Sequence, residues 1–231
     1  MNLLFILDPL DTLNIKKDTS YAMMREAASR GHQTWAAQQK NISFIENKVM
    51  VNARQLSILD DRSAWYEVLE SKELAPAEID GIIMRKDPPF DMEYIYSTYL
   101  LESLEQDGCV VFNRPRSIRD FNEKLAITKY PEFIAPTVVT ADHTTIKQFI
   151  DKNNEIILKP LDGMGGSSIF RSRPDDPNLG VIIETLTDFG RRTIMVQKFI
   201  PQIKDGDKRV LLIDGEAVPF SLARIPQGSD H

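Results

Sequence analysis

The alternation of apolar and polar segments in the first half of the chain predicts strands that alternate with helices. Four short apolar runs have the length of buried strands: 3–7, 33–37, 81–85 and 110–113. Two longer segments, 19–30 and 91–106, have helical spacing and are followed by Gly31 and Gly108. A small hairpin is predicted at 42–53. This pattern predicts a parallel sheet with helices packed on it, ending near Phe121.

One face of the second predicted helix is expected to be apolar and buried. The residues that define it are Met92, Ile95, Tyr96, Tyr99 and Leu104. A third helix is predicted around 116–125, and it carries Lys124.

The second half of the chain has a different order of elements. Strands are predicted at 136–140, 156–160, 168–172 and 193–197, with helices at 142–153 and 178–189. Two further strands, 210–213 and 217–224, are joined by Asp214 and Gly215, which is a strong hairpin signal. The order predicts an α+β module of antiparallel strands with helices on one side, followed by an antiparallel hairpin.

Composition limits the partners of this chain. The sequence has 231 residues, a net charge of -6 at pH 7 and 42% hydrophobic residues, which argues against a broad basic surface for nucleic acid. The single cysteine, Cys109, allows no internal disulfide and lies in an apolar run, where a buried structural thiol is expected. The N-terminus has no basic segment and no long apolar segment, so we expect a cytoplasmic protein.

The segment 156–168 carries the strongest chemical signal. It joins an apolar strand, Lys159 near the end of that strand, and a loop that contains Gly163, Gly165 and Gly166. Glycines let main-chain N–H groups converge on phosphate oxygens, and a lysine adds a point charge. A strand follows the loop, so neither the Walker pattern nor the dinucleotide fingerprint fits. The sequence predicts a hairpin tip that closes over a nucleotide, although ordinary hairpin connections have the same composition.

Charged residues follow two strands of the predicted parallel sheet. Asp8 follows the first strand, and Arg85 ends a later one, beside Lys86 and Asp87. Ligands of open α/β sheets bind beyond the carboxyl ends of the strands, and a guanidinium suits a carboxylate. Arg85 is therefore a candidate for substrate binding, and the alternative is a surface ion pair between Arg85 and Asp87.

Two further segments are candidates for binding. The segment 197–201 leaves a buried strand and turns, so its backbone is placed to hydrogen bond an adenine edge, or it is a simple linker. Arg209 and Arg224 lie at the ends of the two hairpin strands. Two such arginines can converge on one anionic centre and stabilise charge during phosphoryl transfer, although arginines at strand ends also promote solubility.

Five blocks of sequence together resemble the ATP-grasp superfamily and, within it, the bacterial glutathione synthetase family. They are MRKDPPF at 84–90, NEKL at 122–125, ILKPLDGMGG at 157–166, KDGDKR at 204–209 and ARIPQG at 223–228. The resemblance covers the whole of 1–231. The blocks around Arg85 and Lys159 are specific, whereas Lys124 alone indicates only an ATP-grasp protein.

The resemblance implies a fold and a reaction. It implies an N-terminal parallel-sheet substrate domain at 1–121, a central α+β lid domain at 122–200 and the start of a C-terminal antiparallel-sheet domain at 201–231. The implied enzyme is an ATP-dependent ligase. ATP phosphorylates the cysteinyl carboxylate of γ-glutamylcysteine, and the glycine amine attacks the acyl phosphate to give glutathione. Mg²⁺, with Mn²⁺ as an alternative, and a homotetramer are implied as well.

The resemblance also implies roles for single residues. Three groups of residues are expected to bind the nucleotide. Lys124 and Lys159 bind the phosphates. The loop that closes over the phosphates contains Gly163, Met164, Gly165, Gly166 and Ser167, and the adenine is bound by Gln197, Lys198, Phe199 and Ile200. Arg209 is the expected catalytic residue, which steadies the transferring phosphoryl group or the tetrahedral intermediate. Arg85 and Arg224 are expected to bind the dipeptide.

The family continues past the loop at 225–228 with a second glycine-rich flap and the magnesium ligands. The sequence ends at His231, so we expect no metal ligand within it and poor activity from the 231 residues alone. Two alternatives stay open. One is another ATP-grasp ligase with a different acceptor, such as a dipeptide ligase or a glutamate-adding enzyme. The other is a non-catalytic nucleotide-binding module.

Overall fold

The computed structural model describes residues 1–61 and 63–225, and the chain divides into two compact units, Met1–Ala126 and Ile127–His231. The loop block at 223–228 therefore lies partly outside the described residues. None of the helices in the described ranges is long and apolar enough to cross a membrane.

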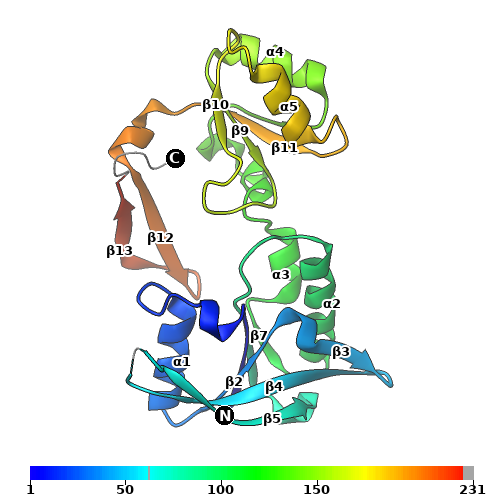
Figure 1. The fold of residues 1–231 in the computed structure, drawn as a ribbon, viewed down its shortest axis with the longest axis vertical. Coiled ribbons are helices and arrows are strands. Elements are labelled where there is room, and N and C mark those ends of the chain that lie inside the picture. The colour runs from blue at the N-terminus through cyan, green and yellow to red at the C-terminus, as the bar shows by residue number, and fades with distance from the viewer. Residues whose placement is uncertain (62, 226–231) are drawn as a thin grey trace. The chain divides into compact units, whose positions relative to one another are not determined.

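The first unit is built on one mixed sheet of seven strands (Figure 1). Four of them run parallel, in the order β2-β1-β6-β7: β1 (Asn2–Ile6), β2 (Gln33–Ala37), β6 (Gly81–Met84) and β7 (Val110–Phe112). Three more continue the sheet beyond β2 as antiparallel strands: β3 (Ile42–Ile45), β4 (Lys48–Ile58) and β5 (Tyr66–Leu74). The expected parallel sheet is thus correct for β2-β1-β6-β7, on one side of the sheet, and wrong for the other side, because the strands after β2 pair in the opposite direction.

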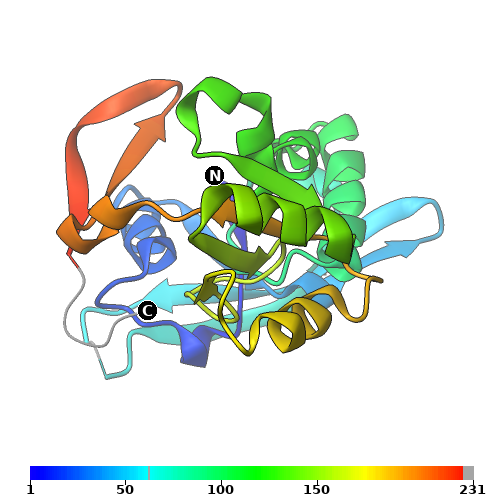
Figure 2. The same cartoon turned by 90° about the horizontal axis from the view of Figure 1, so that it is seen from above.

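Strand β5 was not predicted from the sequence, and β4 runs beyond the expected end of its hairpin. In β5 only Leu74 is buried, and most other side chains are exposed. A strand exposed on both faces does not need apolar alternation, so its charged sequence gives no strand signal. The β3–β4 hairpin reaches out from the edge of the sheet in both views (Figures 1 and 2).

Helices cover both faces of this sheet. In β1, Leu4 and Ile6 join a core cluster that includes Leu101 of α2 (Met92–Gln106), whereas Phe5 joins a second cluster that includes Met24 of α1 (Thr19–Ser29). This division follows from the strand period of two residues. Both helices begin after an aspartate that caps them, because Asp18 accepts a hydrogen bond from the Ser20 N–H and Asp91 accepts one from the Tyr94 N–H.

The predicted buried face of α2 was wrong in part. The buried residues are Tyr94, Ser97, Thr98, Leu101 and Leu104. Met92, Tyr96 and Tyr99 are each more than half exposed. The true face includes small hydroxyl residues that hydrogen bond within the helix: Ser97 donates to the Tyr94 carbonyl at 2.7 Å. Satisfied hydroxyls pack in a core like small apolar groups, so a count of apolar residues selects the wrong face.

The helix predicted at 116–125 is shorter than expected. Helix α3 spans Pro115–Asp120, and Lys124 lies in a turn before the 3-10 helix η4 (Leu125–Lys129). Five other 3-10 turns occur in the described ranges: η1 (Leu10–Thr12), η2 (Gln39–Asn41), η3 (Pro76–Glu78), η5 (Pro131–Phe133) and η6 (Pro201–Asp205).

The second unit contains a four-stranded antiparallel sheet in the order β10-β9-β11-β8. Its strands are β8 (Thr137–Thr140), β9 (Ile156–Pro160), β10 (Phe170–Ser172) and β11 (Ile194–Lys198). Helices α4 (His143–Asn153) and α5 (Leu179–Thr187) contribute Ile146 and Ile183 to one core with Leu158 of β9. The predicted antiparallel module, with helices on one side, is confirmed (Figure 1).

A separate two-stranded sheet follows, formed by β12 (Asp207–Ile213) and β13 (Glu216–Arg224) (Figures 1 and 2). The turn between them uses positive φ angles of 51° at Asp214 and 81° at Gly215, as the sequence predicted for a tight hairpin.

Candidate functional site

In the first unit, Arg85 lies directly after β6 and is held by hydroxyl groups. Its N–H donates to the Ile6 carbonyl at 2.7 Å. Its guanidinium donates to Ser20 Oγ at 3.1 Å and to Thr19 Oγ1 at 2.7 Å, at the start of α1. Neither acceptor carries a charge, and the exposed guanidinium stays available to an anion. The hydrogen bonds fix Arg85 on α1, in place of the surface ion pair with Asp87 that the sequence left open.

Two clefts open beside this strand end, within the first unit. The larger has a volume of about 900 Å³, and Lys86, Tyr94, Cys109, Asn113, Asn122 and Glu123 are among its lining residues. The smaller, of about 530 Å³, is lined by Asp8, Gln38, Lys40, Lys86, Glu93 and Tyr96 among others. Lys86 lines both. The candidate substrate segment therefore borders enough space for a small molecule.

Burial further favours the uncharged form of two groups in the larger cleft. Desolvation raises the pKa of the Tyr94 hydroxyl to about 12, and this hydroxyl donates to the Lys86 carbonyl at 3.2 Å. Desolvation also raises the pKa of the Cys109 thiol, which points to the Pro76 carbonyl at 3.4 Å. A buried cysteine with a raised pKa is a poor nucleophile, which agrees with the structural role expected from the sequence.

Lys124 is positioned by the residue two places before it. The Asn122 side chain accepts hydrogen bonds from the N–H groups of Lys124 at 3.1 Å and Leu125 at 3.0 Å. The Lys124 ammonium lies 3.4 Å from a Glu123 carboxylate oxygen, and only 15% of its side chain is exposed. The turn made by Asn122, and not a helix, thus sets the direction of Lys124.

In the second unit, two of the predicted nucleotide ligands share one face of the sheet. Lys159 of β9 pairs with Met195 of β11, and Gln197 lies two residues further along β11. Leu158 and Val196 point to the opposite face, into the helical core. Because strand residues alternate between faces, Lys159 and Gln197 lie on the side away from α4 and α5.

The glycine loop between β9 and β10 has the backbone that the sequence predicted. Gly165 and Gly166 have φ angles of +66° and +81°, and nothing lies within 4 Å of an added Cβ at either position. The loop therefore needs glycine for its backbone shape, and not because neighbours crowd it. Met164 is exposed, and Ser167 donates to the Met164 carbonyl at 3.3 Å.

The base of this loop is tied to the end of α5. Arg192, which follows the helix, donates a hydrogen bond to the Asp162 carboxylate. This contact was not expected from the sequence.

The segment 197–200 is held by hydrogen bonds to other residues of the second unit. The Lys198 and Phe199 N–H groups donate to the carbonyls of Pro136 and Glu155, each at 2.9 Å. The Gln197 side chain donates to Thr137 Oγ1 at 2.9 Å. These two N–H donors are therefore already used, and an adenine would bind through other groups of the segment, including exposed Ile200.

A charge cluster not expected from the sequence fixes Phe199. Arg171 of β10 lies 3.9 Å from the centre of the Phe199 ring, which is a cation–π contact. The Glu155 carboxylate accepts hydrogen bonds from Arg171 at 2.6 Å and from Arg173 at 3.0 Å. These hydrogen bonds, with Arg171 the strongest, hold the pKa of Glu155 below its ordinary value of 4.5. The spacing of these residues gives no signal in the sequence.

On the hairpin, Arg209 and Arg224 lie on one face, because Arg224 pairs with Asp207 and Arg209 pairs with Leu222. Arg224 makes two hydrogen bonds to the Asp207 carboxylate, at 2.6 and 2.5 Å, which lower the pKa of Asp207. Gly206 is required beside this pair, since an added Cβ would lie 2.3 Å from the Arg224 carbonyl oxygen. Arg224 is thus already paired, whereas Arg209 projects from the exposed strand beside it.

Comparison with known proteins decides which family this geometry belongs to. Residues 1–119 match the family model for the prokaryotic glutathione synthetase N-terminal domain, and residues 123–231 match that for its ATP-grasp domain. The chain is 54% identical over 230 residues to a glutathione synthetase of Nitrosomonas europaea, covering 98% of this chain and 72% of the relative. It is 50% identical to that of Ralstonia nicotianae, covering 71% of the relative.

The chain belongs to the prokaryotic glutathione synthetase family.

Solved structures agree with the fold of this glutathione synthetase family. A D-cycloserine synthetase, DcsG, matches with a TM-score of 0.61 at 11% identity, covering 97% of this chain and 75% of that one. A D-alanyl-alanine synthetase A from Vibrio cholerae matches with a TM-score of 0.59 at 13% identity, covering 98% of this chain and 68% of that one. At such low identity these matches support the ATP-grasp fold alone.

The boundary between the two glutathione synthetase family models falls beside Lys124. The described residues contain no group of three or more His, Cys, Asp or Glu that could hold a metal ion.

Proposed function

We propose that this protein is an ATP-dependent ligase that joins γ-glutamylcysteine to glycine and forms glutathione through an acyl phosphate. The observation that carries this proposal is the match of both units to the glutathione synthetase family, with 54% identity to one relative. ATP transfers its γ-phosphoryl group to the cysteinyl carboxylate. The glycine amine then attacks the acyl carbon, which forms the amide bond and releases phosphate.

Lys159 and the loop at 163–167 supply the nucleotide site in this proposal. Lys159 is half-buried and lies on the open face of its sheet, so its ammonium can neutralise phosphate charge without competition from water on every side. The positive φ angles of Gly165 and Gly166 let main-chain N–H groups turn toward the phosphates. The segment from Gln197 to Ile200 binds the adenine.

Lys124 is the second phosphate ligand, and Arg209 stabilises the charge that develops during transfer. Lys124 has its main chain fixed by Asn122, which limits the conformations of its side chain. Arg209 has no side-chain hydrogen bond among those of the described hairpin, whereas Arg224 is bound to Asp207. This difference supports Arg209 as the residue that acts on the reacting phosphoryl group.

Arg85 and Arg224 bind the carboxylates of the dipeptide. For Arg85, the support is a guanidinium fixed by neutral hydroxyls, directly before Lys86, which lines both clefts. For Arg224 to bind a substrate carboxylate, its guanidinium must either release Asp207 or bind both carboxylates at once. No side chain acts as a nucleophile in this reaction, because positioning and charge stabilisation suffice.

Magnesium, with manganese as the alternative, would enter as the counter-ion of ATP. No step attributed here to a side chain depends on it. A homotetramer and a cytoplasmic location stay predictions. The domain limits 1–121, 122–200 and 201–231 also stay a proposal, in which the strand pair after 201 begins a third domain.

ADP release by the full-length protein tests the proposed function. The protein receives ATP and magnesium with γ-glutamylcysteine alone, glycine alone, or both. We expect ADP and phosphate at high rate only with both, together with one glutathione per ADP. Equal turnover with another dipeptide or amino acid pair would indicate a different ATP-grasp ligase, and ATP binding without any turnover would indicate a nucleotide-binding module.

A further inference from the structure

Asp8 lies where the order of strands in the first sheet reverses. Strand β1 has β2 on one side and β6 on the other, both parallel to it. The chain reaches β2 through α1 and returns to the other side of β1 only at β6. Ligands of open α/β sheets bind at such a point, outside the carboxyl ends of the strands. Asp8 follows β1 there, and Arg85, Lys86 and Asp87 follow β6.

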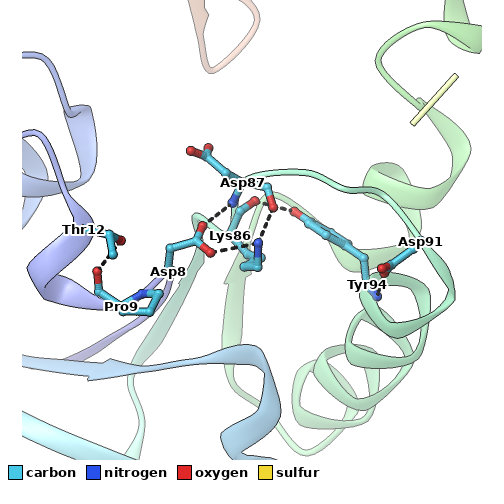
Figure 3. A network of polar contacts seen from close by, with 7 residues as sticks. All are labelled: Asp8, Pro9, Thr12, Lys86, Asp87, Asp91 and Tyr94. Atoms are coloured by element: carbon cyan, nitrogen blue, oxygen red, sulfur yellow. Dashed lines mark hydrogen bonds and ion pairs between the residues drawn. The ribbon is translucent and has the colours of Figure 1, made fainter. Parts of the chain in front are cut away.

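The Asp8 carboxylate joins the ends of the two strands (Figure 3). One oxygen accepts a hydrogen bond from the Asp87 N–H at 2.9 Å, and the other lies 2.9 Å from the Lys86 ammonium. The Lys86 ammonium also donates to the Asp87 carbonyl at 2.6 Å. Only 28% of the Asp8 side chain and 20% of the Lys86 side chain are exposed, so water screens this pair weakly.

The same segment is held from its other side by α2. The Tyr94 hydroxyl donates to the Lys86 carbonyl, and the N–H of Tyr94 binds the helix cap Asp91 (Figure 3). The carboxylate of Asp87 points away from Asp8 in this view. Asp8 therefore contacts the main chain of Asp87 and the side chain of Lys86. These two contacts fix the path of the chain directly after Arg85.

We propose that Asp8 is a positioning residue for substrate binding, which acts through Lys86 and the Asp87 N–H to hold Arg85 in place. This inference rests on the proposed function, in which Arg85 binds a carboxylate of the dipeptide. Arg85 itself is fixed by α1 through Thr19 and Ser20, and its main chain by β1. Asp8 secures the following two residues, so that the guanidinium has one position before substrate arrives.

The test compares Asp8→Asn with Asp11→Asn in the full-length protein. Asparagine keeps an oxygen for the Asp87 N–H but removes the charge that pairs with Lys86. Asp11 is a matched control, because it lies three residues away and its carboxylate accepts a hydrogen bond from the Tyr66 hydroxyl at 2.7 Å, which asparagine also accepts. We expect Asp8→Asn to raise KM for γ-glutamylcysteine about tenfold. KM for ATP and kcat stay within about twofold of the wild type.

Lys86→Met and the double variant identify the route of the effect. If Asp8 acts through Lys86, Lys86→Met alone raises the same KM, and the double variant is little worse than either single variant. We expect Asp8→Ala to raise KM for γ-glutamylcysteine more than Asp8→Asn does, because alanine also removes the acceptor of the Asp87 N–H. Lys86→Met also tests the inference independently if Asp8→Asn does not fold.

Three results would overturn the inference. The first is an unchanged KM for γ-glutamylcysteine in Asp8→Asn. The second is a parallel change in all kinetic constants together with a lowered midpoint of thermal unfolding, which indicates a structural role only. The third is full additivity in the double variant, which would show that Asp8 does not act through Lys86. A wild-type protein that forms no glutathione would instead refute the proposed function.

Discussion

The two units hold their candidate binding residues in different ways. In the first unit, Arg85 and Lys86 are fixed by side chains from distant parts of the sequence, including Asp8, Thr19 and Ser20. In the second, the glycine loop and Lys159, which we propose bind the nucleotide, depend on backbone shape: positive φ angles in the loop and strand register for Lys159. If the proposed roles are right, binding of the dipeptide should be sensitive to single polar side chains, and binding of ATP to charge and backbone conformation.

The largest effect is expected from Lys159→Met. It removes the ammonium that the proposal places on the ATP phosphates, and we expect kcat/KM for ATP to fall about a thousandfold. Lys147→Met on the exposed side of α4 is the matched control and should leave this ratio unchanged. Steady-state ADP release at varied ATP concentration measures kcat/KM for ATP in both variants. A fall of less than about threefold for Lys159→Met would remove it from the nucleotide site.

Arg85→Lys is expected to have the next largest effect, on the other substrate. Lysine keeps the charge but cannot reproduce the planar fork that binds Thr19 and Ser20 while facing an anion. We expect KM for γ-glutamylcysteine to rise about a hundredfold with little change in KM for ATP.

The control for this variant is Arg30→Lys, a surface arginine whose side chain is 67% exposed and pairs with Glu26. Arg30→Lys should leave KM for γ-glutamylcysteine and KM for ATP unchanged. If Arg85→Lys changed KM for ATP as much as that for the dipeptide, Arg85 would not belong to the dipeptide site as proposed.

The sequence predicted most of the fold because apolar runs mark buried strands. The four parallel strands and the antiparallel module were found in this way, whereas the final hairpin, whose strands are exposed, was found from its turn residues Asp214 and Gly215. Its failures have a common cause: β5 is exposed on both faces, and α2 buries Ser97 and Thr98, so neither follows the apolar pattern. The apolar pattern of the sequence detects elements that bury apolar side chains. It cannot detect strands or helix faces that lack such side chains.

The candidate site was harder to predict than the fold. The sequence motifs selected Arg85, Lys124 and Lys159, but not the contacts between distant residues around the candidate site. The bond from Asp8 to the Asp87 N–H spans 79 positions, and that from Arg171 to Glu155 spans 16. Such contacts depend on which strands become neighbours, which only the folded chain determines.

A smaller effect is expected from Gly165→Ala, which tests the role of backbone shape in the second unit. Alanine has space at this position but is strained at a φ of +66°. A cost of about 1 kcal/mol is expected for the closed loop, which raises KM for ATP about fivefold. Gly180→Ala in α5, also in open space, should instead stabilise the helix by about 0.5–1 kcal/mol and leave KM unchanged.

The smallest effect concerns the Glu155 cluster and its dependence on pH. Hydrogen bonds from Arg171 and Arg173 lower the pKa of Glu155 below 4.5, so the folded state binds this proton less tightly than the unfolded chain does. The stabilisation is therefore present above the unfolded pKa and is lost as pH falls through the lower folded pKa. The wild type should be slightly more stable than Glu155→Gln at neutral pH, and this difference should shrink as the solution is acidified below 4.5.

Urea unfolding at several pH values measures this difference, with Glu132→Gln on the exposed turn η5 as the control. Because Arg171 also lies against the Phe199 ring, Glu155→Gln should raise KM for ATP slightly, by less than about twofold. A rise as large as that of Gly165→Ala would show that side-chain contacts, and not backbone shape alone, organise the nucleotide site. The difference between the two units would then be one of degree.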